Sequence, residues 1–193
     1  MIIISLSGVL VPGPLTTVTI AKGYENKLAG CLTSFGHGVV EFPLMALIYL
    51  GLAQFFNSEE VKTVIGLIGG LALVYMGIGI IKIKREIFEE SKDLAYGSIT
   101  AGVIATGSNP YFFLWWGTIG AALIVNASIF GPIIFITFMI VHWLCDFLWL
   151  SFVSIAIFKS RRFLDKKLRE AIFSICGLLL IAFGLWFILS AFS

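Results

Sequence analysis

Residues 2–21 read IIISLSGVLVPGPLTTVTIA, and residues 98–125 read SITAGVIATGSNPYFFLWWGTIGAALIV. Both stretches are long and apolar enough to cross about 30 Å of hydrocarbon, which takes roughly 20 helical residues. Each is interrupted near its middle, by V-P-G-P at 11–14 and by G-S-N-P at 107–110. Proline removes a backbone donor and clashes with the preceding turn, so each interruption ends one half-helix and starts another. Two broken membrane helices are therefore predicted.

The composition of the whole chain excludes a soluble domain. Hydrophobic residues make up 59% of the 193 residues and charged residues 12%, whereas soluble domains average roughly 45–50% and about 25%. The three cysteines have no paired spacing, and no phosphate loop, nucleophile motif or metal motif is present. The sequence therefore predicts no enzymatic activity and no cofactor.

Long apolar runs recur along the chain, separated by short polar breaks. Backbone groups in lipid must be hydrogen-bonded internally, so these runs have to be helices. The sequence thus predicts an all-α integral membrane protein with six transmembrane helices in a single transporter domain, 1–193. The expected spans are residues 2–21, 28–54, 61–81, 98–125, 130–158 and 170–192.

The basic residues predict the orientation of these spans. Twelve of the 13 Lys and Arg residues lie in the first, third and fifth polar breaks, and only Lys62 lies in an even-numbered one. The positive-inside rule places those three breaks in the cytoplasm, and hence both termini on the extracytoplasmic side of the cell membrane. We interpret the basic fifth break as a topology signal beside anionic lipid headgroups, with no nucleic-acid partner.

Polar landmarks in the first half of the chain recur in the second. His37 and Glu41 reappear as His142 and Asp146, 105 residues later, and the two proline breaks stand at matching places. Three helices are an odd number, so a duplicated unit would cross the membrane upside down. We therefore predict an inverted 3+3 repeat with halves of about 1–92 and 93–193, in which helices 1 and 4 are broken at mid-membrane. The glycines offset by 107 residues are Gly70 and Gly77 in the third span and Gly177 and Gly184 in the sixth.

Two carboxylates stand near the middle of their spans. Glu41 is the midpoint of the second span and Asp146 lies within two residues of the midpoint of the fifth. A charge at that depth costs at least roughly 2.5–3.5 kcal/mol, so a partner, water or a proton must compensate it. A residue four positions away shares the same helix face, so His37 can support Glu41 and His142 can support Asp146. These four side chains could simply lock helices together, but we favour a proton-coupling role in a cavity.

The two breaks supply complementary chemistry. The N–H groups that follow Pro14 and Pro110 lie at the positive end of a helix dipole, so the breaks could form an anion site if both face one cavity. Simple kinks are the alternative. Trp115 and Trp116 could line this pocket or face lipid. The predicted substrate-binding residues are Pro12, Gly13, Pro14, Glu41, Asn109, Pro110 and Asp146.

These landmarks also carry a resemblance to a known family. The V-P-G-P segment at 11–14, the Gly36–Glu41 stretch, S-N-P-Y-F-F at 108–113, and Asp146 with Trp149 resemble the LysE-type amino-acid exporters, the lysine, homoserine and threonine efflux proteins. The Gly177 to Gly184 ending also fits. The resemblance implies efflux of small amino acids or related metabolites, driven as an antiporter by the proton gradient.

Two positions depart from the pattern of that family. Glu41 stands where the family often has Asp, and Tyr111 stands where it often has Lys. The second departure removes a positive group that the resemblance places near the substrate. The sequence does not identify the solute, and it leaves a homo-oligomer open.

Other functions fit the sequence less well. A divalent metal-cation exporter could use His37, Glu41, His142 and Asp146, because imidazole and carboxylate ligands suit several divalent metals. The absence of a thiolate and of a His-rich loop argues against it. A membrane thiol–disulfide relay would need a cysteine at each broken helix, and neither break has one. The expected partners are therefore a small-molecule substrate, protons and membrane lipid.

Overall fold

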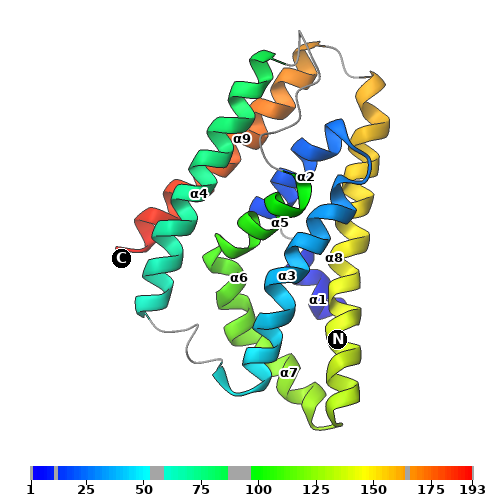
Figure 1. Cartoon of the computed structure of the whole chain (residues 1–193), viewed down its shortest axis with the longest axis vertical. Helices are drawn as coiled ribbons and strands as arrows, with labels where there is room; N and C mark the ends of the chain where they lie inside the picture. Colours follow the sequence, from blue (N-terminus) through cyan, green and yellow to red (C-terminus); the bar gives the residue numbers. More distant parts are fainter. Residues whose placement is uncertain (1, 11–12, 53–58, 87–96, 164–165, 193) are drawn as a thin grey trace.

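The computed structural model describes residues 2–10, 13–52, 59–86, 97–163 and 166–192, and these ranges contain helices and no strand (Figure 1). The helices are α1 (Ile2–Val9), α2 (Pro14–Glu25), α3 (Ala29–Tyr49), α4 (Glu59–Glu86), α5 (Ser98–Gly107), α6 (Pro110–Trp115), the π-helix η2 (Trp116–Gly120), α7 (Ala121–Ser128), α8 (Pro132–Ser160), the 3₁₀-helix η3 (Arg161–Phe163) and α9 (Lys166–Ser190).

Five helical stretches in the described ranges are long and apolar enough to cross a membrane. They are Ala29–Tyr49, Glu59–Lys82, Pro110–Ser128, Pro132–Phe163 and Glu170–Ser190. These stretches correspond to the second through sixth predicted spans. The first predicted span is instead divided into α1, with 8 residues, and α2, with 12, each too short to cross a bilayer alone.

Both chain interruptions lie where the prolines predict them. Helix α1 ends at Val9 and α2 begins at Pro14, after the extended N-cap residue Gly13 (φ −144°, ψ −171°). Pro12 lies outside the described residues. The second interruption separates α5 from α6, which begins at Pro110. Each of these prolines stands in the first turn of its new helix, where a missing N–H leaves no hydrogen bond unmade.

The helices run further into the polar segments than the apolar runs suggest. Lys22 belongs to the first polar break predicted from the sequence, which follows residue 21. In the structure it lies inside α2, and only 2% of the residue is exposed. The reason is the late start of α2 at Pro14, together with an aliphatic stem that packs well against apolar neighbours. Helix α4 likewise continues to Glu86 and α8 to Ser160.

Helices α4 and α9 lie side by side along one flank of the bundle, with α3 and α8 on the other and α5 and α6 between them (Figure 1). Glycines bring the α4 and α9 backbones into contact. A Cβ atom added at Gly70 would lie 2.6 Å from the carbonyl oxygen of Gly184, and one added at Gly77 would lie 2.6 Å from that of Gly177. The glycines of α9 meet the α4 carbonyls in the same way. Such close small-residue packing is typical of membrane helices.

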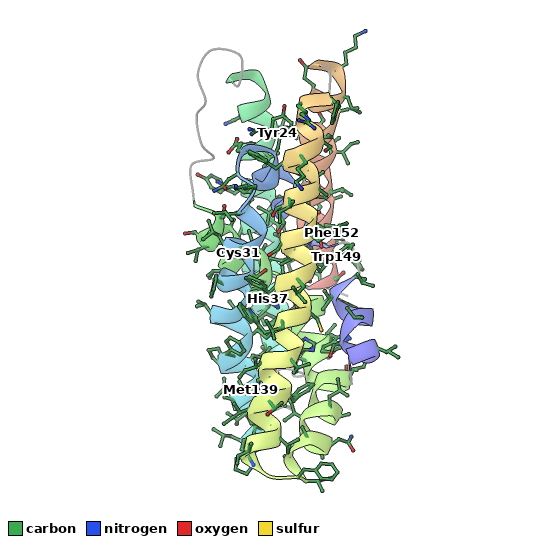
Figure 2. All side chains as sticks on the ribbon, turned by 90° about the vertical axis from the view of Figure 1, so that its right-hand side faces the viewer. Tyr24, Cys31, His37, Met139, Trp149 and Phe152 are labelled. Atoms are coloured by element: carbon green, nitrogen blue, oxygen red, sulfur yellow. The ribbon has the colours of Figure 1, made fainter. Side chains whose placement is uncertain are left out.

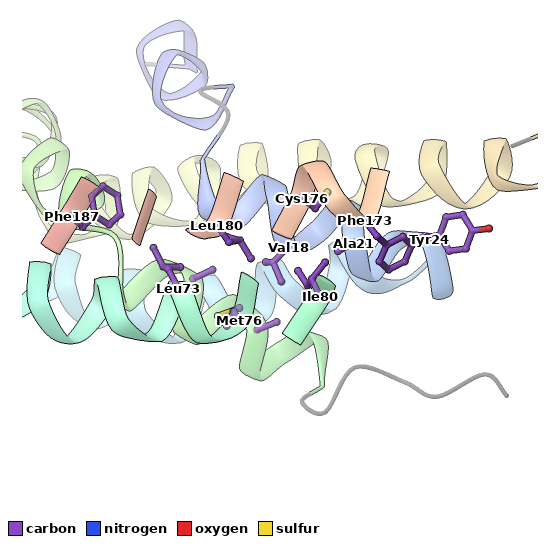
Figure 3. Close-up of a cluster of buried hydrophobic side chains, with 12 residues drawn as sticks. Val18, Ala21, Tyr24, Leu73, Met76, Ile80, Phe173, Cys176, Leu180 and Phe187 are labelled. Atoms are coloured by element: carbon purple, nitrogen blue, oxygen red, sulfur yellow. The ribbon is translucent and has the colours of Figure 1, made fainter. Parts of the chain in front are cut away.

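An apolar cluster connects α2 with this glycine-packed pair. Val18 of α2 belongs to the cluster together with Leu73 and Met76 of α4 and Phe173 and Leu180 of α9, all of them fully buried or nearly so (Figure 3). A second cluster joins α3, the α6–α7 segment and α8. The proline-started half-helix α2 packs mainly against α8, α5, α9 and α3.

Candidate functional site

The four titratable residues singled out by the sequence come from two facing helices. His37 and Glu41 are one turn apart on α3, and His142 and Asp146 are one turn apart on α8. All four are buried, with 1–7% of each residue exposed. His37 lies along the bundle between Tyr24, toward one end, and Met139, toward the other (Figure 2).

These residues form one cluster. Glu41 Oε1 lies 2.9 Å from His37 Nε2 and 3.5 Å from His142 Nε2. Asp146 Oδ2 lies 3.8 Å and 3.9 Å from the same two nitrogens. His142 thus lies near Asp146 on its own helix, and the facing of α3 and α8 brings it slightly closer to Glu41.

A cavity of about 100 Å³ adjoins the cluster, with room for about three water molecules at roughly 30 Å³ each. All four titratable side chains line it, and so do Gly13 at the first break and Asn109 at the second. Glu41 Oε2 and Asp146 Oδ2 have no hydrogen-bond partner in the part of the chain that the structure describes. Because buried polar atoms are normally paired, these two oxygens could accept a hydrogen bond from a solute once the side chains turn toward the cavity.

The two breaks differ in how their helix N-termini are capped. The Asn109 side chain accepts a hydrogen bond from the Tyr111 N–H at 3.1 Å, so it already caps α6. Gly13 gives α2 no side-chain cap, and the next residues, Leu15 and Thr16, line the cavity. The two helix N-termini of the predicted anion site therefore differ, and the N-terminus of α2 is the one without a side-chain cap. Pro14 is buried at the start of α2.

The remaining residues of the second break divide between two surfaces. Pro110 and Tyr111 line a separate apolar groove with Trp186 and Phe187, outside the cavity. The departure from the family pattern at Tyr111 therefore does not alter the cavity lining. Phe112, next along α6, does face the cavity.

Two tryptophans cover the cluster from the α6–η2 junction. Trp115 is 8% exposed and Trp116 is 1% exposed. Both side chains therefore line the pocket and do not face lipid. Their ring centroids lie 5.5 Å and 4.8 Å from that of His142. Trp116 also begins a π-helical turn, a feature that often marks functional sites.

Two hydroxyl groups that the sequence analysis did not single out complete the cluster. Thr106 Oγ1 of α5 lies 2.9 Å from His37 Nδ1, and Ser5 Oγ of α1 lies 2.8 Å from His142 Nδ1. Both residues are buried, 2% and 3% exposed. Nothing local marks them, because serine and threonine occur throughout apolar membrane helices.

The cluster is more open than a closed metal site. His37, Glu41 and Asp146 each bring one ligand atom, and these atoms lie within 4.8 Å of one another. Zinc ligands at about 2.0–2.2 Å from a tetrahedral ion lie roughly 3.3–3.6 Å from one another. His37 Nε2 lies 2.9 Å from Glu41 Oε1 and 3.8 Å from Asp146 Oδ2, so a divalent ion could enter as cargo after small side-chain shifts.

Comparisons with known proteins identify the family of this chain. Residues 6–191 match the LysE type translocator family. A similar protein from Bacillus subtilis (strain 168), named "Putative amino acid efflux protein YcgF", is 27% identical over 192 residues, covering 96% of this chain and 92% of the relative. No solved structure matches the chain significantly. The chain is a multi-pass membrane protein that belongs to the LysE type translocator family.

Proposed function

We propose that this protein exports small amino acids or related metabolites from the cell in exchange for protons. The observation that carries the proposal is one cavity lined by two carboxylates, two histidines and both helix breaks. An amino acid presents a carboxylate and an ammonium group, and this cavity offers a partner for each. The efflux named for the Bacillus relative points the same way.

The carboxylate of the substrate would bind at the start of α2. Its N-terminus has no side-chain cap, carries the positive end of the helix dipole and faces the cavity through Leu15 and Thr16. The ammonium group would bind at Glu41 and Asp146, each of which has an oxygen available to a donor. A cavity of about 100 Å³ favours a small side chain between these two ends.

Alternating access would follow from an inverted repeat with halves 1–92 and 93–193. The contact of α3 His37 with α5 Thr106 has its counterpart in the contact of α8 His142 with α1 Ser5. The glycine contacts between α4 and α9 are reciprocal in the same way. Repeats of this kind rock around a fixed central site. Substrate would displace a proton from the cluster on the cytoplasmic side, and protonation from outside would release it.

Efflux from proteoliposomes tests this proposal directly. Vesicles that contain the protein are loaded with a small neutral amino acid, and a pH gradient is imposed in either direction. We expect efflux to accelerate when the gradient drives protons inward and to lose that acceleration when an ionophore collapses it. Efflux that ignores the gradient would refute antiport, and no efflux of any amino acid tried would refute the substrate class.

The proposed orientation has a separate test. Twelve of 13 basic residues lie in odd-numbered breaks, so both termini should be extracytoplasmic. A reporter fused after Ser193 should behave as extracytoplasmic, and one inserted between α8 and α9 as cytoplasmic. The reverse pattern would overturn the orientation.

Metal export remains the alternative because three potential ligand atoms lie within 4.8 Å. The substitutions His37→Gln and His142→Gln separate the two functions. If the histidines only orient the acids, amino-acid efflux should fall by about tenfold, the worth of one hydrogen bond to a charged group. If they bind the cargo, metal uptake into inverted vesicles should occur with the unmodified protein and vanish in both variants.

A further inference from the structure

Each half of the cluster has a buried hydroxyl behind its imidazole. Thr106 reaches His37 Nδ1 from α5, and Ser5 reaches His142 Nδ1 from α1. Both hydroxyls thus come from the first half of a broken helix, and both histidines turn the opposite nitrogen toward Glu41. The arrangement occurs twice, between residues that are 69 and 137 positions apart in the sequence.

Most other helical hydroxyls in the described ranges behave differently. Thr17, Ser34 and Thr118 each donate to the carbonyl oxygen four residues earlier, at 2.7–2.8 Å. That local bond is the usual way for a hydroxyl to be satisfied inside a helix. Thr106 and Ser5 instead form interhelical hydrogen bonds to imidazole rings.

The chemistry of imidazole gives this contact a specific consequence. A neutral histidine has one N–H donor and one acceptor nitrogen, and the partner of one nitrogen decides which tautomer is present. The Glu41 carboxylate can only accept, so it requires the ring hydrogen on Nε2. Nδ1 is then an acceptor, and the hydroxyl behind it donates the hydrogen bond that this buried nitrogen would otherwise lack.

We infer that Thr106 and Ser5 are positioning residues that hydrogen-bond Nδ1 of His37 and His142, hold each Nε2 toward Glu41 and tie the broken helices to the carboxylates. Thr106 is three residues before Asn109, so its hydrogen bond links the second break to Glu41 through His37. Glu41 and Asp146 are the titratable groups that face both rings in the described part of the chain. The consequence for transport rests on the proposed function, whereas the hydrogen bonds to the two rings do not.

The chain contains only two histidines, which makes the tautomers directly observable. Protein labelled with 15N-histidine and placed in lipid nanodiscs should give two sets of ring nitrogen signals, assigned with His37→Gln. At a pH that gives neutral rings, we expect both to show a protonated Nε2 and an unprotonated Nδ1. Thr106→Val removes the donor to His37 Nδ1, so it should shift the signal of that nitrogen and leave His142 unchanged. Ser5→Ala should do the reverse.

The unaffected histidine in each variant reports on folding, so a lost signal from misfolded protein is recognised at once. Thr106→Ser keeps the hydroxyl and should restore the Nδ1 signal of His37. Thr100→Val is a matched control, because Thr100 is exposed on the same helix, and it should change neither ring. An unchanged His37 Nδ1 signal in Thr106→Val would overturn the inference.

Transport gives the second readout. Thr106→Val should lower the maximal efflux rate about fivefold, the worth of one hydrogen bond, and Thr106→Ser should restore it. Equal loss in Thr106→Val and Thr106→Ser would show that the side-chain volume matters and the hydroxyl does not. If the unmodified protein exports no amino acid, the proposed function fails, while the nitrogen signals still decide the inference.

Discussion

The pair α3–α8 and the pair α4–α9 use membrane-spanning helices in opposite ways. Helices α3 and α8 face each other with four titratable side chains and leave a cavity beside them. Helices α4 and α9 face each other with glycines and leave no room even for a methyl group at Gly70 or Gly77. The first pair leaves a cavity beside its titratable side chains, and the second brings two backbones into contact.

This difference shows how a small membrane protein can keep charged groups in its centre. Buried carboxylates cost free energy, and a cavity forgoes the packing that would offset that cost. The glycine contacts of α4 and α9 give van der Waals packing at close range without any polar group. Val18 of α2 shares an apolar cluster with residues of both helices of that pair, which connects the tight region to the half-helix whose first turn lines the cavity.

The largest expected effect lies in the cavity. Glu41→Gln keeps the shape of the side chain and removes the titratable charge that contacts both histidines. Gradient-driven efflux should fall by at least about 100-fold, since interactions with a buried charged group are worth up to about 3 kcal/mol. Asp146→Asn should act in the same direction. The measurement is amino-acid efflux per folded protein in proteoliposomes.

The exposed residue Glu59 supplies the control for this prediction. Glu59→Gln makes the same chemical change on α4, away from the cavity, and should leave efflux unaltered. If Glu41→Gln and Asp146→Asn both export with undiminished dependence on the proton gradient, the acids are structural and the contrast between the two helix pairs loses its functional meaning.

An intermediate effect is expected where packing and chemistry meet, between α3 and α5. A Cβ atom at Gly102 would collide with the carbonyl group of Thr33 and push α5 away from α3. Gly102→Ala should therefore lower the free energy of unfolding by about 1–3 kcal/mol and, by stretching the contact of Thr106 with His37, reduce efflux about fivefold. Both quantities are measured on protein in detergent and in vesicles.

Gly107 offers the matched control on α5, because a Cβ atom there meets nothing within 4 Å. Gly107→Ala should be close to neutral for stability and for efflux. A Gly102→Ala protein that is destabilised yet transports normally would separate the α3–α5 contact from the chemistry of the cluster.

The smallest effect on transport is expected in the glycine-packed pair. Gly77→Ala forces a methyl group against the carbonyl oxygen of Gly177 and should cost about 1–3 kcal/mol of stability. Gly79, on the same helix, has open space, so Gly79→Ala should be neutral or stabilise by up to about 1 kcal/mol. Thermal unfolding in detergent compares the two. Efflux per folded protein should stay within about twofold in both, and a selective loss in Gly77→Ala would show that α4 and α9 move during transport.

Local signals in the sequence predicted much of this architecture. Proline acts on its own neighbourhood, so the start of α2 at Pro14 and of α6 at Pro110 follows from residue type alone. The four-residue spacing of His37 and Glu41 likewise fixes a shared helix face. The prediction that Gly13 and Asn109 approach one cavity came from the matching places of the two breaks, and both residues do line it.

What the sequence did not predict depends on contacts between distant segments. The choice of Glu41 over Asp146 as the nearer partner of His142 depends on how α3 and α8 face each other. The hydroxyls of Ser5 and Thr106 look like those of any apolar helix until their partners are known. The burial of Lys22 was missed because hydropathy assigns every lysine to a break, regardless of where the helix begins.

The hydroxyl contacts also determine what the cluster does when its proton load changes. A hydroxyl can both donate and accept, so Thr106 need not release His37 when the ring gains a second hydrogen. If the added proton goes to the ring, Nδ1–H donates to Thr106. If it goes to Glu41 Oε1, that group donates to Nε2 and the neutral ring again donates through Nδ1. In both cases the hydrogen bond between Thr106 and His37 persists with donor and acceptor exchanged. The broken helix therefore remains hydrogen-bonded to a site whose charge has changed.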